Sequence, residues 1–398
     1  NRLRGLGVNV LIGHSEKNLG EAAVVVISSA IKEGNPELDE ARKRLTPVVR
    51  RAEMLGELMR FKWAIAIGGT HGKTTTSSIL GHIMAAVKAT SFLGGIAENY
   101  NSNLILRSAE ISVVEADEFD RSFLQLSPNI ACVTSMDADH LDIYGDPSSI
   151  EDAFKDFSDL LPNSDNLLVK KGLPLTGKTV AIEESADFEA QNVRIENGSY
   201  VFDLKTPTTV LKDLKFYLPG HHNLFNAVTA LGMAILAGSP IHRIPNALLS
   251  FKGVQRRFTY KIKTKDLVLI DDYAHHPTEI DALFQAVSEM YPHDKKSIVF
   301  QPHLFSRTKD FVNGFARSLS RFDEVFLLPI YPAREQPIEG VTSQWLLDKT
   351  TNTKKQLVSK NSLSAIIKNS DCRIKLLVGA GDIGVEVHTI TKYLLDEA

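Results

Sequence analysis

The chain has 398 residues, of which 43% are hydrophobic and 23% are charged, and its formal net charge is −3. This composition is typical of globular proteins and excludes fibrous and disordered chains, while the length favours two or three domains. The slightly acidic balance offers no basic surface for nucleic acid, and no apolar run approaches the ~20 residues that a membrane helix needs.

Residues 1–59 alternate short apolar runs with polar stretches, as expected of a small α/β module. Strands are predicted at Val8–Ile12 and at Ala22–Ile27. The chain opens on what resembles the end of a helix, so we expect a further strand and loop to precede it. Ser28 and Ser29 follow the second strand directly. Ligands of open α/β sheets bind at such strand ends, although two serines can equally cap a helix.

The next stretch carries the strongest local signal. An apolar run, Trp63–Ile67, predicts a buried strand, and an amphipathic segment after the following hydroxyl residues predicts a helix. Between them lies the loop Gly68-Gly-Thr-His-Gly72, followed by Lys73 and Thr74. Loop amides and helix N-termini bind phosphates, a lysine reaches the outer phosphates, and a hydroxyl holds Mg²⁺. We therefore predict an ATP site at Gly69, Thr70, His71, Gly72, Lys73, Thr74 and Thr75.

The spacing of this loop departs from the common phosphate-binding pattern, G-x-x-x-x-G-K-[ST]. That pattern requires a glycine five residues before Gly72, where this chain has Ile67, so the cradle is shorter. The alternative is a glycine turn with an incidental lysine. We disfavour it because the glycines, the lysine and the hydroxyl residues all stand where phosphate binding needs them.

Two later strands, predicted at residues 111–116 and 130–134, each end in carboxylate or imidazole side chains. The carboxyl ends of parallel strands lie at one edge of a sheet, and Mg²⁺ prefers oxygen ligands and phosphate. The alternative is that these groups are solvated loop charges. We predict that Glu115 and His140 bind the metal together with Thr74. Asp117 and Asp139 are expected to support these ligands.

A Gly-His-His-Asn turn at residues 220–223 leads into a helix of small and apolar residues. Asn223 and Asn226 carry amides that can read the edge of a purine, although a plain helix cap explains the turn equally well. Near the end of the chain, Gly379–Gly384 formally matches a dinucleotide-binding fingerprint. Too few residues follow it to complete such a unit, so we expect close helix–strand packing there.

Strands and helices alternate throughout, and most strands run into polar loops. The predicted fold is therefore α/β with three domains. These are a Rossmann-like N-terminal module at 1–59, a central P-loop ATPase-type domain at 60–253, and a Rossmann-like C-terminal domain at 254–398.

Several blocks along nearly the whole chain resemble the Mur ligase family. Four of them match family blocks in order: Gly69–Thr76, Glu115–Asp120, Asp137–His140 and Gly220–Asn226. Three more resemble the members that join L-alanine to UDP-N-acetylmuramate: Asp271–Glu279, Phe300–His303 and Tyr331–Glu335. The resemblance implies three domains and an ATP-dependent ligase of peptidoglycan precursor synthesis. In that reaction ATP phosphorylates the sugar-linked carboxylate, and the amine of L-alanine attacks the acyl phosphate.

The resemblance also implies roles for single residues on the nucleotide side. Lys73 would hold the β- and γ-phosphates, while Thr74, Glu115 and His140 would bind the metal. The other nucleotide contacts it implies are Asn223, Asn226, Asp272, His276 and Arg257 or its neighbour Arg256.

On the substrate side, His303 and Arg307 stand where the carboxylate of alanine is expected, and His303 is the nearest candidate for the general base. Leu304 occupies a position where an arginine is expected, so Arg307 would make this contact alone. The implied contacts to the UDP-sugar and the closing loop are Ser28, Ser29, Phe92, Asn101, Asn103 and His275.

Two other activities stay open. One is a ligase that reattaches a recycled tripeptide to the same sugar nucleotide, against which the block Phe300–His303 favours a single amino acid. The other is an ATP-binding regulatory module that ligates nothing, for which Glu115 and His140 need not matter. We expect a monomer or homodimer. Cys132 lies in an apolar run and is predicted to be a buried free thiol, which favours the reducing cytoplasm.

Overall fold

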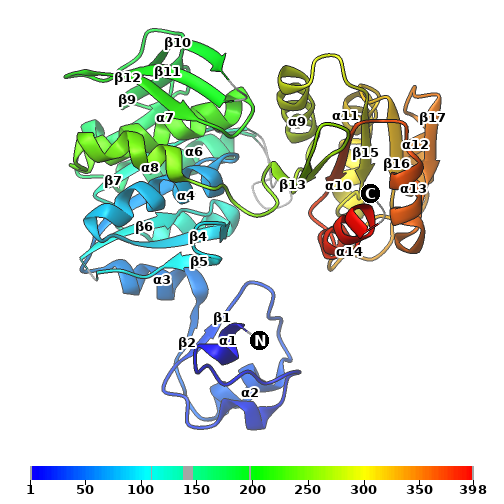
Figure 1. The fold of residues 1–398 in the computed structure, drawn as a ribbon. Helices are drawn as coiled ribbons and strands as arrows, with labels where there is room; N and C mark the ends of the chain where they lie inside the picture. The colour runs from blue at the N-terminus through cyan, green and yellow to red at the C-terminus, as the bar shows by residue number, and fades with distance from the viewer. Residues whose placement is uncertain (1, 109, 138–146, 197–198, 397–398) are drawn as a thin grey trace.

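The computed structural model of the chain describes residues 2–108, 110–137, 147–196 and 199–396. Within these ranges the strands form three sheets, of two, ten and six strands, and each sheet carries its own helices (Figure 1). The predicted three-domain α/β fold is therefore confirmed. The N-terminal, central and C-terminal modules are named here after these three sheets.

The N-terminal module is built on two parallel strands, β1 (Val25–Ile27) and β2 (Val48–Arg50). Its α-helices are α1 (Arg2–Gly5) and α2 (Pro36–Lys43), and α3 (Arg51–Met59) leads from it onto the central module. The strand predicted at Val8–Ile12 was wrong. In the described structure these residues are largely exposed and pair with no strand, and an extended segment needs such a partner for its backbone groups.

The central module is a ten-stranded sheet in the order β12-β11-β10-β9-β8-β7-β3-β6-β4-β5. Its strands are β3 (Trp63–Gly68), β4 (Thr90–Ala97), β5 (Ser102–Ile105), β6 (Ile111–Glu115), β7 (Ile130–Val133), β8 (Leu167–Lys170), β9 (Lys178–Ile182), β10 (Phe188–Glu196), β11 (Ser199–Lys205) and β12 (Val210–Phe216). Strands β4 to β10 around β3 are parallel apart from β5, whereas β5, β11 and β12 make antiparallel pairs.

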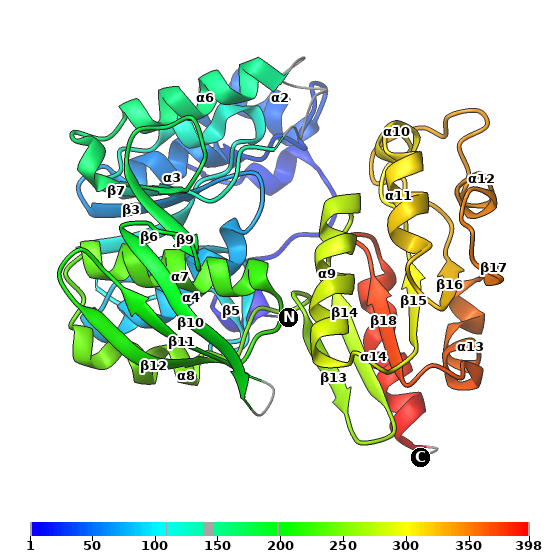
Figure 2. The same cartoon turned by 90° about the horizontal axis from the view of Figure 1, so that it is seen from above.

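Helices cover both faces of this sheet (Figure 2). One face carries α4 (Lys73–Met84), α7 (His221–Leu236) and α8 (Ile244–Ser250), and the other carries α3 and α6 (Pro147–Asp159). Strand β3 is central and almost wholly buried, because its apolar side chains pack on both helical layers. No helix in the described ranges has the length and hydropathy needed to cross a bilayer.

The C-terminal module is a six-stranded sheet in the order β13-β14-β18-β15-β16-β17, parallel except for β13. Its strands are β13 (Thr259–Lys263), β14 (Val268–Asp272), β15 (Lys296–Phe300), β16 (Glu324–Leu327), β17 (Lys354–Leu357) and β18 (Ile374–Val378). Its helices are α9 (Pro277–Met290), α10 (Phe305–Asp310), α11 (Val312–Leu319), α12 (Ser343–Asp348), α13 (Leu363–Asn369) and α14 (Ile383–Asp396).

A short linker joins the central and C-terminal modules. The amide of Gln255 donates to Ile96 O in the central module at 2.9 Å, whereas the amide of Phe258 donates to Asp272 Oδ2 in the C-terminal module at 2.7 Å. Helix α9 also reaches across, because Tyr200 Oη of β11 donates to Glu289 Oε2 at 2.8 Å. This contact fastens the C-terminal end of α9 to β11, while Glu279 in its first turn lies 3.8 Å from His71 Nδ1 of the phosphate loop.

Candidate active site

The glycine loop predicted to hold phosphate connects β3 to α4, as expected. Gly69 and Gly72 have φ angles of 129° and 85°, which glycine adopts without strain. A Cβ on Gly69 would collide with Thr134 Oγ1 after β7, and a Cβ on Gly72 would collide with Asn226 Oδ1 of α7. The loop is therefore clamped between two neighbours, while the first-turn amides of α4 lack intrahelical partners.

Ser135 supports this loop, and the sequence reasoning gave it no role. Its Oγ accepts from the amide of His71 at 2.8 Å and lies 2.8 Å from Thr70 Oγ1. Thr134 Oγ1 donates to His71 O at 2.5 Å. The sequence feature that could have indicated this role is the hydroxyl pair Thr134-Ser135 directly after a parallel strand. These contacts hold the loop in shape and engage the His71 amide, which was expected to face phosphate.

Lys73 extends back over the loop. Its ammonium donates to Gly69 O at 2.8 Å and to Glu118 Oε2 at 2.5 Å. The Glu118 side chain is only 3% exposed, and burial raises the pKa of its carboxyl group while Lys73 opposes that rise. The sequence reasoning missed Glu118, since it looked like one more carboxylate of an acidic loop.

Thr74 and Glu115 meet at the carboxyl end of β6. Thr74 Oγ1 lies 2.9 Å from Glu115 Oε1, and Glu115 Oε2 accepts from the amide of Gly94 at 2.8 Å. Two neighbouring ligands of an octahedral Mg²⁺ ion are ~3 Å apart when their bonds are ~2.1 Å long. These two oxygens therefore fit a magnesium site.

The other predicted metal groups are placed only in part. His140 and Asp139 lie outside the described residues. Asp117 lines the same cavity as Glu115, and its Oδ2 lies 3.9 Å from Arg51 Nη2 at the start of α3. Among the residues that the structure describes, no group of three acidic, histidine or cysteine side chains gathers as a metal site.

A cavity of about 420 Å³ opens over the phosphate loop and is shared by the central and C-terminal modules. The central module contributes Lys73, Thr74 and Glu115, and the C-terminal module contributes Tyr273, His275 and Glu279. The residues predicted to bind phosphate and metal therefore line the same cavity as His275 of the predicted closing loop.

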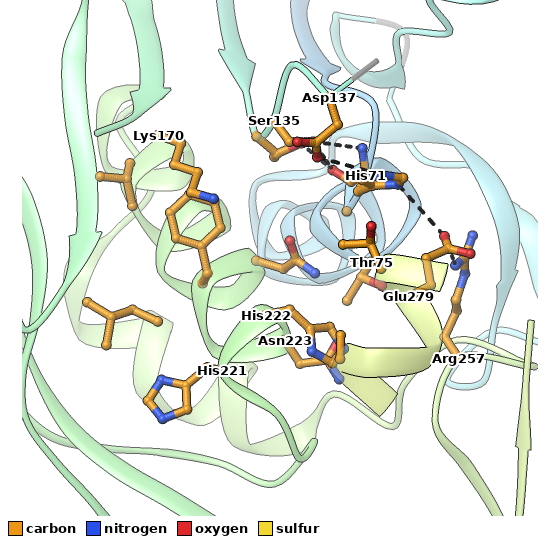
Figure 3. A pocket seen from close by; sticks show the side chains of 18 of the residues that line it. His71, Thr75, Ser135, Asp137, Lys170, His221, His222, Asn223, Arg257 and Glu279 are labelled. Atoms are coloured by element: carbon orange, nitrogen blue, oxygen red, sulfur yellow. Dashed lines mark hydrogen bonds and ion pairs between the residues drawn. The ribbon is translucent and has the colours of Figure 1, made fainter. Parts of the chain in front are cut away.

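A second cavity of about 520 Å³ lies beside it, against α7 (Figure 3). Asn223 and Asn226, the predicted base contacts, both line it, and Asn223 Nδ2 donates to Pro219 O at 2.6 Å. Phe225 and Lys170 line the same cavity, with the Lys170 ammonium 5.7 Å from the ring centre. Burial lowers the pKa of His222 to about 4, so this side chain is neutral at pH 7.

Glu279 links the two modules at the junction of these cavities. Its carboxylate lies 3.8 Å from His71 Nδ1 and 3.9 Å from Arg257 Nη1 (Figure 3). It also lies 3.3 Å from His275 Nδ1. Burial by itself would raise the pKa of Glu279, but His275, Arg257 and His71 together lower it to about 2. The sequence reasoning assigned Glu279 no role of its own, because its partners His71 and Arg257 are distant along the chain.

The structure shows which of the two linker arginines, Arg256 or Arg257, lies at the cavities with Asp272. Burial raises the pKa of Asp272 to about 6, against the opposing charge of Arg257, and both residues line the larger cavity. Arg256 instead donates to Gly379 O at 2.5 Å and lies against Gly384. The Gly379–Gly384 loop therefore packs around a guanidinium, and Arg257 is the arginine that faces the cavities.

The predicted acceptor residues lie next to His275. The His303 ring is 6.2 Å from the His275 ring and stacks on Tyr331 at 5.7 Å. Burial, with His275 and Arg307, lowers the pKa of His303 to about 4. Its Nδ1 is buried and has no hydrogen-bond partner among the described residues. His303 is thus a neutral but weakly basic imidazole at pH 7.

Several predicted contacts do not line either cavity in the described structure, although the His276 ring lies 6.0 Å from the ring of His71. His276 caps α9 by accepting from the amide of Thr278, and its ring packs on Phe311 at 4.6 Å. Ser28 and Ser29 follow β1 and are exposed. Phe92 lies in β4, Asn101 has a φ of 47° between β4 and β5, and Asn103 lies in β5. Their roles stay predictions.

Comparison with protein families gives three matches in chain order. Residues 1–63 match the Mur ligase family catalytic domain, residues 67–234 the Mur ligase middle domain, and residues 256–383 the Mur ligase glutamate ligase domain. The three matches together span most of the chain.

Individual relatives point the same way. A UDP-N-acetylmuramate–L-alanine ligase of Christiangramia forsetii is 57% identical over 383 residues, covering 96% of this chain and 85% of the relative. The solved UDP-N-acetylmuramate-alanine ligase MurC of Thermotoga maritima has a TM-score of 0.85 at 25% identity, covering 100% of this chain and 90% of its own. The MurF ligase of Thermotoga maritima, solved with ADP, has a TM-score of 0.68 at 16% identity, covering 96% and 97%.

Proposed function

The chain belongs to the Mur ligase family, and from this premise we propose that it joins L-alanine to UDP-N-acetylmuramate at the expense of ATP. The product is the first amide bond of a peptidoglycan precursor. One observation carries the proposal beyond family membership. The phosphate loop, the Thr74–Glu115 pair and the closing-loop residue His275 line one cavity, and the acceptor residue His303 lies next to His275.

The first half-reaction takes place over the phosphate loop. A carboxylate oxygen of the sugar nucleotide attacks the γ-phosphorus, the bond to the bridging oxygen of ADP breaks, and an acyl phosphate forms. Lys73 and the first-turn amides of α4 offset the charge on the phosphates. Thr74 and Glu115 would hold Mg²⁺, with His140 as the proposed third protein ligand, and this ion would screen the phosphate oxygens from the incoming carboxylate.

The second half-reaction needs an amine without its extra proton. The nitrogen of alanine attacks the acyl carbon, inorganic phosphate leaves, and one proton is released. We assign the proton to His303, because its ring lies 6.2 Å from that of His275 in the cavity wall and its Nδ1 has no hydrogen-bond partner among the described residues. Arg307 of α10 would pair with the carboxylate of alanine.

The proposed division of labour follows the three modules. Residues 1–59 hold the UDP-sugar, with Ser28 and Ser29 at the end of β1. Residues 60–253 hold ATP, whose base lies in the larger cavity near Asn223 and Asn226. Residues 254–398 bring alanine and close the site. Both cysteines are buried and unpaired, which suits a cytoplasmic enzyme.

A panel of acceptors tests the function. The purified chain is given ATP, Mg²⁺ and UDP-N-acetylmuramate, with L-alanine, a tripeptide or no acceptor, and ADP release is measured. We expect ADP release that depends on L-alanine. Robust release with the tripeptide and none with L-alanine would replace the proposal with the recycling ligase. Nucleotide binding without acceptor-dependent release would favour the regulatory module.

Arg307→Ala is expected to raise the KM for L-alanine by about tenfold to hundredfold, because a charge-assisted, bidentate contact is lost. The KM for ATP should change little. Steady-state kinetics with each substrate varied in turn measures both values. Arg317→Ala is a matched control, since Arg317 is exposed on the next helix, α11. An effect confined to ATP would show that alanine binds elsewhere.

A further inference from the structure

Lys73 and Glu118 form an ion pair in the wall of the smaller cavity. The side chains are 13% and 3% exposed, so solvent screens this pair far less than a surface pair. The pair also joins two elements, since Lys73 begins α4 and Glu118 follows β6. The contact therefore fixes the end of a long, flexible side chain beside the phosphate loop.

The carboxylate is the more restrained partner, because its side chain is 3% exposed against 13% for Lys73 and has one rotatable bond fewer. Glu118 precedes the 3₁₀ helix η3 (Phe119–Gln125), whose turn is closed by the amide of Phe123 donating to Asp117 O at 2.9 Å. Lysine, by contrast, has four rotatable side-chain bonds and loses substantial entropy when its end is held. The geometry indicates that Glu118 positions Lys73, and that the reverse does not hold.

Two acceptors orient the ammonium, Gly69 O and Glu118 Oε2, as far as the described residues show. An ammonium has three N–H donors, so one donor is left for a phosphate oxygen. We infer that Glu118 is a positioning residue that holds the Lys73 ammonium in the orientation in which it meets the γ-phosphate. This inference rests on the proposed function for its kinetic part and on nucleotide binding alone for the rest.

The same carboxylate has an opposing effect on binding. It carries negative charge into a cavity that is proposed to receive a triphosphate, and like charges at close range repel. Neutralising Glu118 should therefore help the nucleotide to bind while it lets Lys73 move. A positioning role thus predicts opposite changes in affinity and turnover, whereas a purely structural ion pair predicts neither.

The test uses Glu118→Gln and Glu118→Asp in the full chain. Affinity is measured by calorimetry with the β,γ-imido analogue of ATP and Mg²⁺, and turnover by ADP release. For Glu118→Gln we expect kcat to fall about tenfold to hundredfold, because small misplacements of a phosphate-binding group cost that much. Its dissociation constant for the analogue should fall about threefold to tenfold. Glu118→Asp keeps the charge but shortens the reach, so kcat should fall without tighter binding.

Glu324→Gln is the matched control. Glu324 is also buried and pairs with a lysine, Lys354, at 3.1 Å in the sheet of the C-terminal module. It should leave both readouts unchanged. Weaker binding together with lower kcat in Glu118→Gln would overturn the inference, and so would unchanged kcat. A raised Mg²⁺ requirement would instead make Glu118 a metal ligand and would also overturn it. If the wild-type chain binds the analogue but releases no ADP, the proposed function fails, and the affinity arm still decides the binding part.

Discussion

Lys73→Ala is expected to abolish ADP release, with a loss of at least ~1000-fold, because phosphoryl transfer depends on fixed positive charge at the γ-phosphate. The fold should survive, since Lys73 lies at the wall of a cavity and not in a hydrophobic core. The structure adds a cost that the sequence did not suggest. Without Lys73, the buried carboxylate of Glu118 loses its cation, so we expect the Tm to fall by a few degrees.

A double variant separates these two effects. Lys73→Ala/Glu118→Gln removes both charges, so its Tm should return toward the wild-type value while its activity stays lost. Calorimetric melting and an ADP-release assay on the same samples measure the two outcomes. Lys215→Ala, an exposed lysine on β12, should change neither. Normal turnover in Lys73→Ala would remove the phosphate loop from the mechanism.

Glu115→Gln is expected to lower turnover about 100-fold to 1000-fold and to raise the Mg²⁺ concentration needed for half-maximal activity. A neutral amide oxygen is a weaker ligand for a hard cation than a carboxylate. The side chain also accepts from the Gly94 amide and from Thr74 Oγ1, and a glutamine must turn its own NH₂ group toward one of these donors. Activity measured across a Mg²⁺ titration gives both values.

Glu110→Gln serves as the control for this change, because Glu110 is exposed just before β6. The regulatory alternative predicts that Glu115→Gln binds nucleotide normally and changes nothing else. An unchanged Mg²⁺ dependence with reduced stability would show instead that Glu115 only supports β4 through the Gly94 amide. His140→Ala belongs in the same series, and for it we expect impaired turnover with little loss of stability.

Local patterns determined the phosphate loop and its flanking elements. The apolar run of β3, the glycines at positions 69 and 72, and the hydroxyl residues that open α4 are all consecutive in the chain. The pairing of Thr74 with Glu115 also followed from the sequence, because the ends of parallel strands meet at one sheet edge. Family resemblance extended this prediction to the whole chain, and the three sheets confirm the fold.

Tertiary structure alone decided which charges meet. Lys73 pairs with Glu118, 45 residues away, and Glu279 of the C-terminal module lies beside His71 of the phosphate loop. It also separated Arg256, which holds the Gly379–Gly384 loop, from Arg257, which faces the cavities. The strand expected at Val8–Ile12 failed for a related reason, since pairing depends on a partner that a local pattern does not contain.

The physical reason is one of range. Backbone preference, periodicity and glycine geometry act within a few residues, so a single sequence predicted the phosphate loop and the Thr74–Glu115 pair at its edge. Which charged groups pair depends on burial and on distances between modules, because these determine how strongly two charges interact. The sequence by itself therefore predicted a loop that holds a triphosphate. Only the folded chain decided how Glu118 aims Lys73 and how Glu279 ties the closing loop to that cradle.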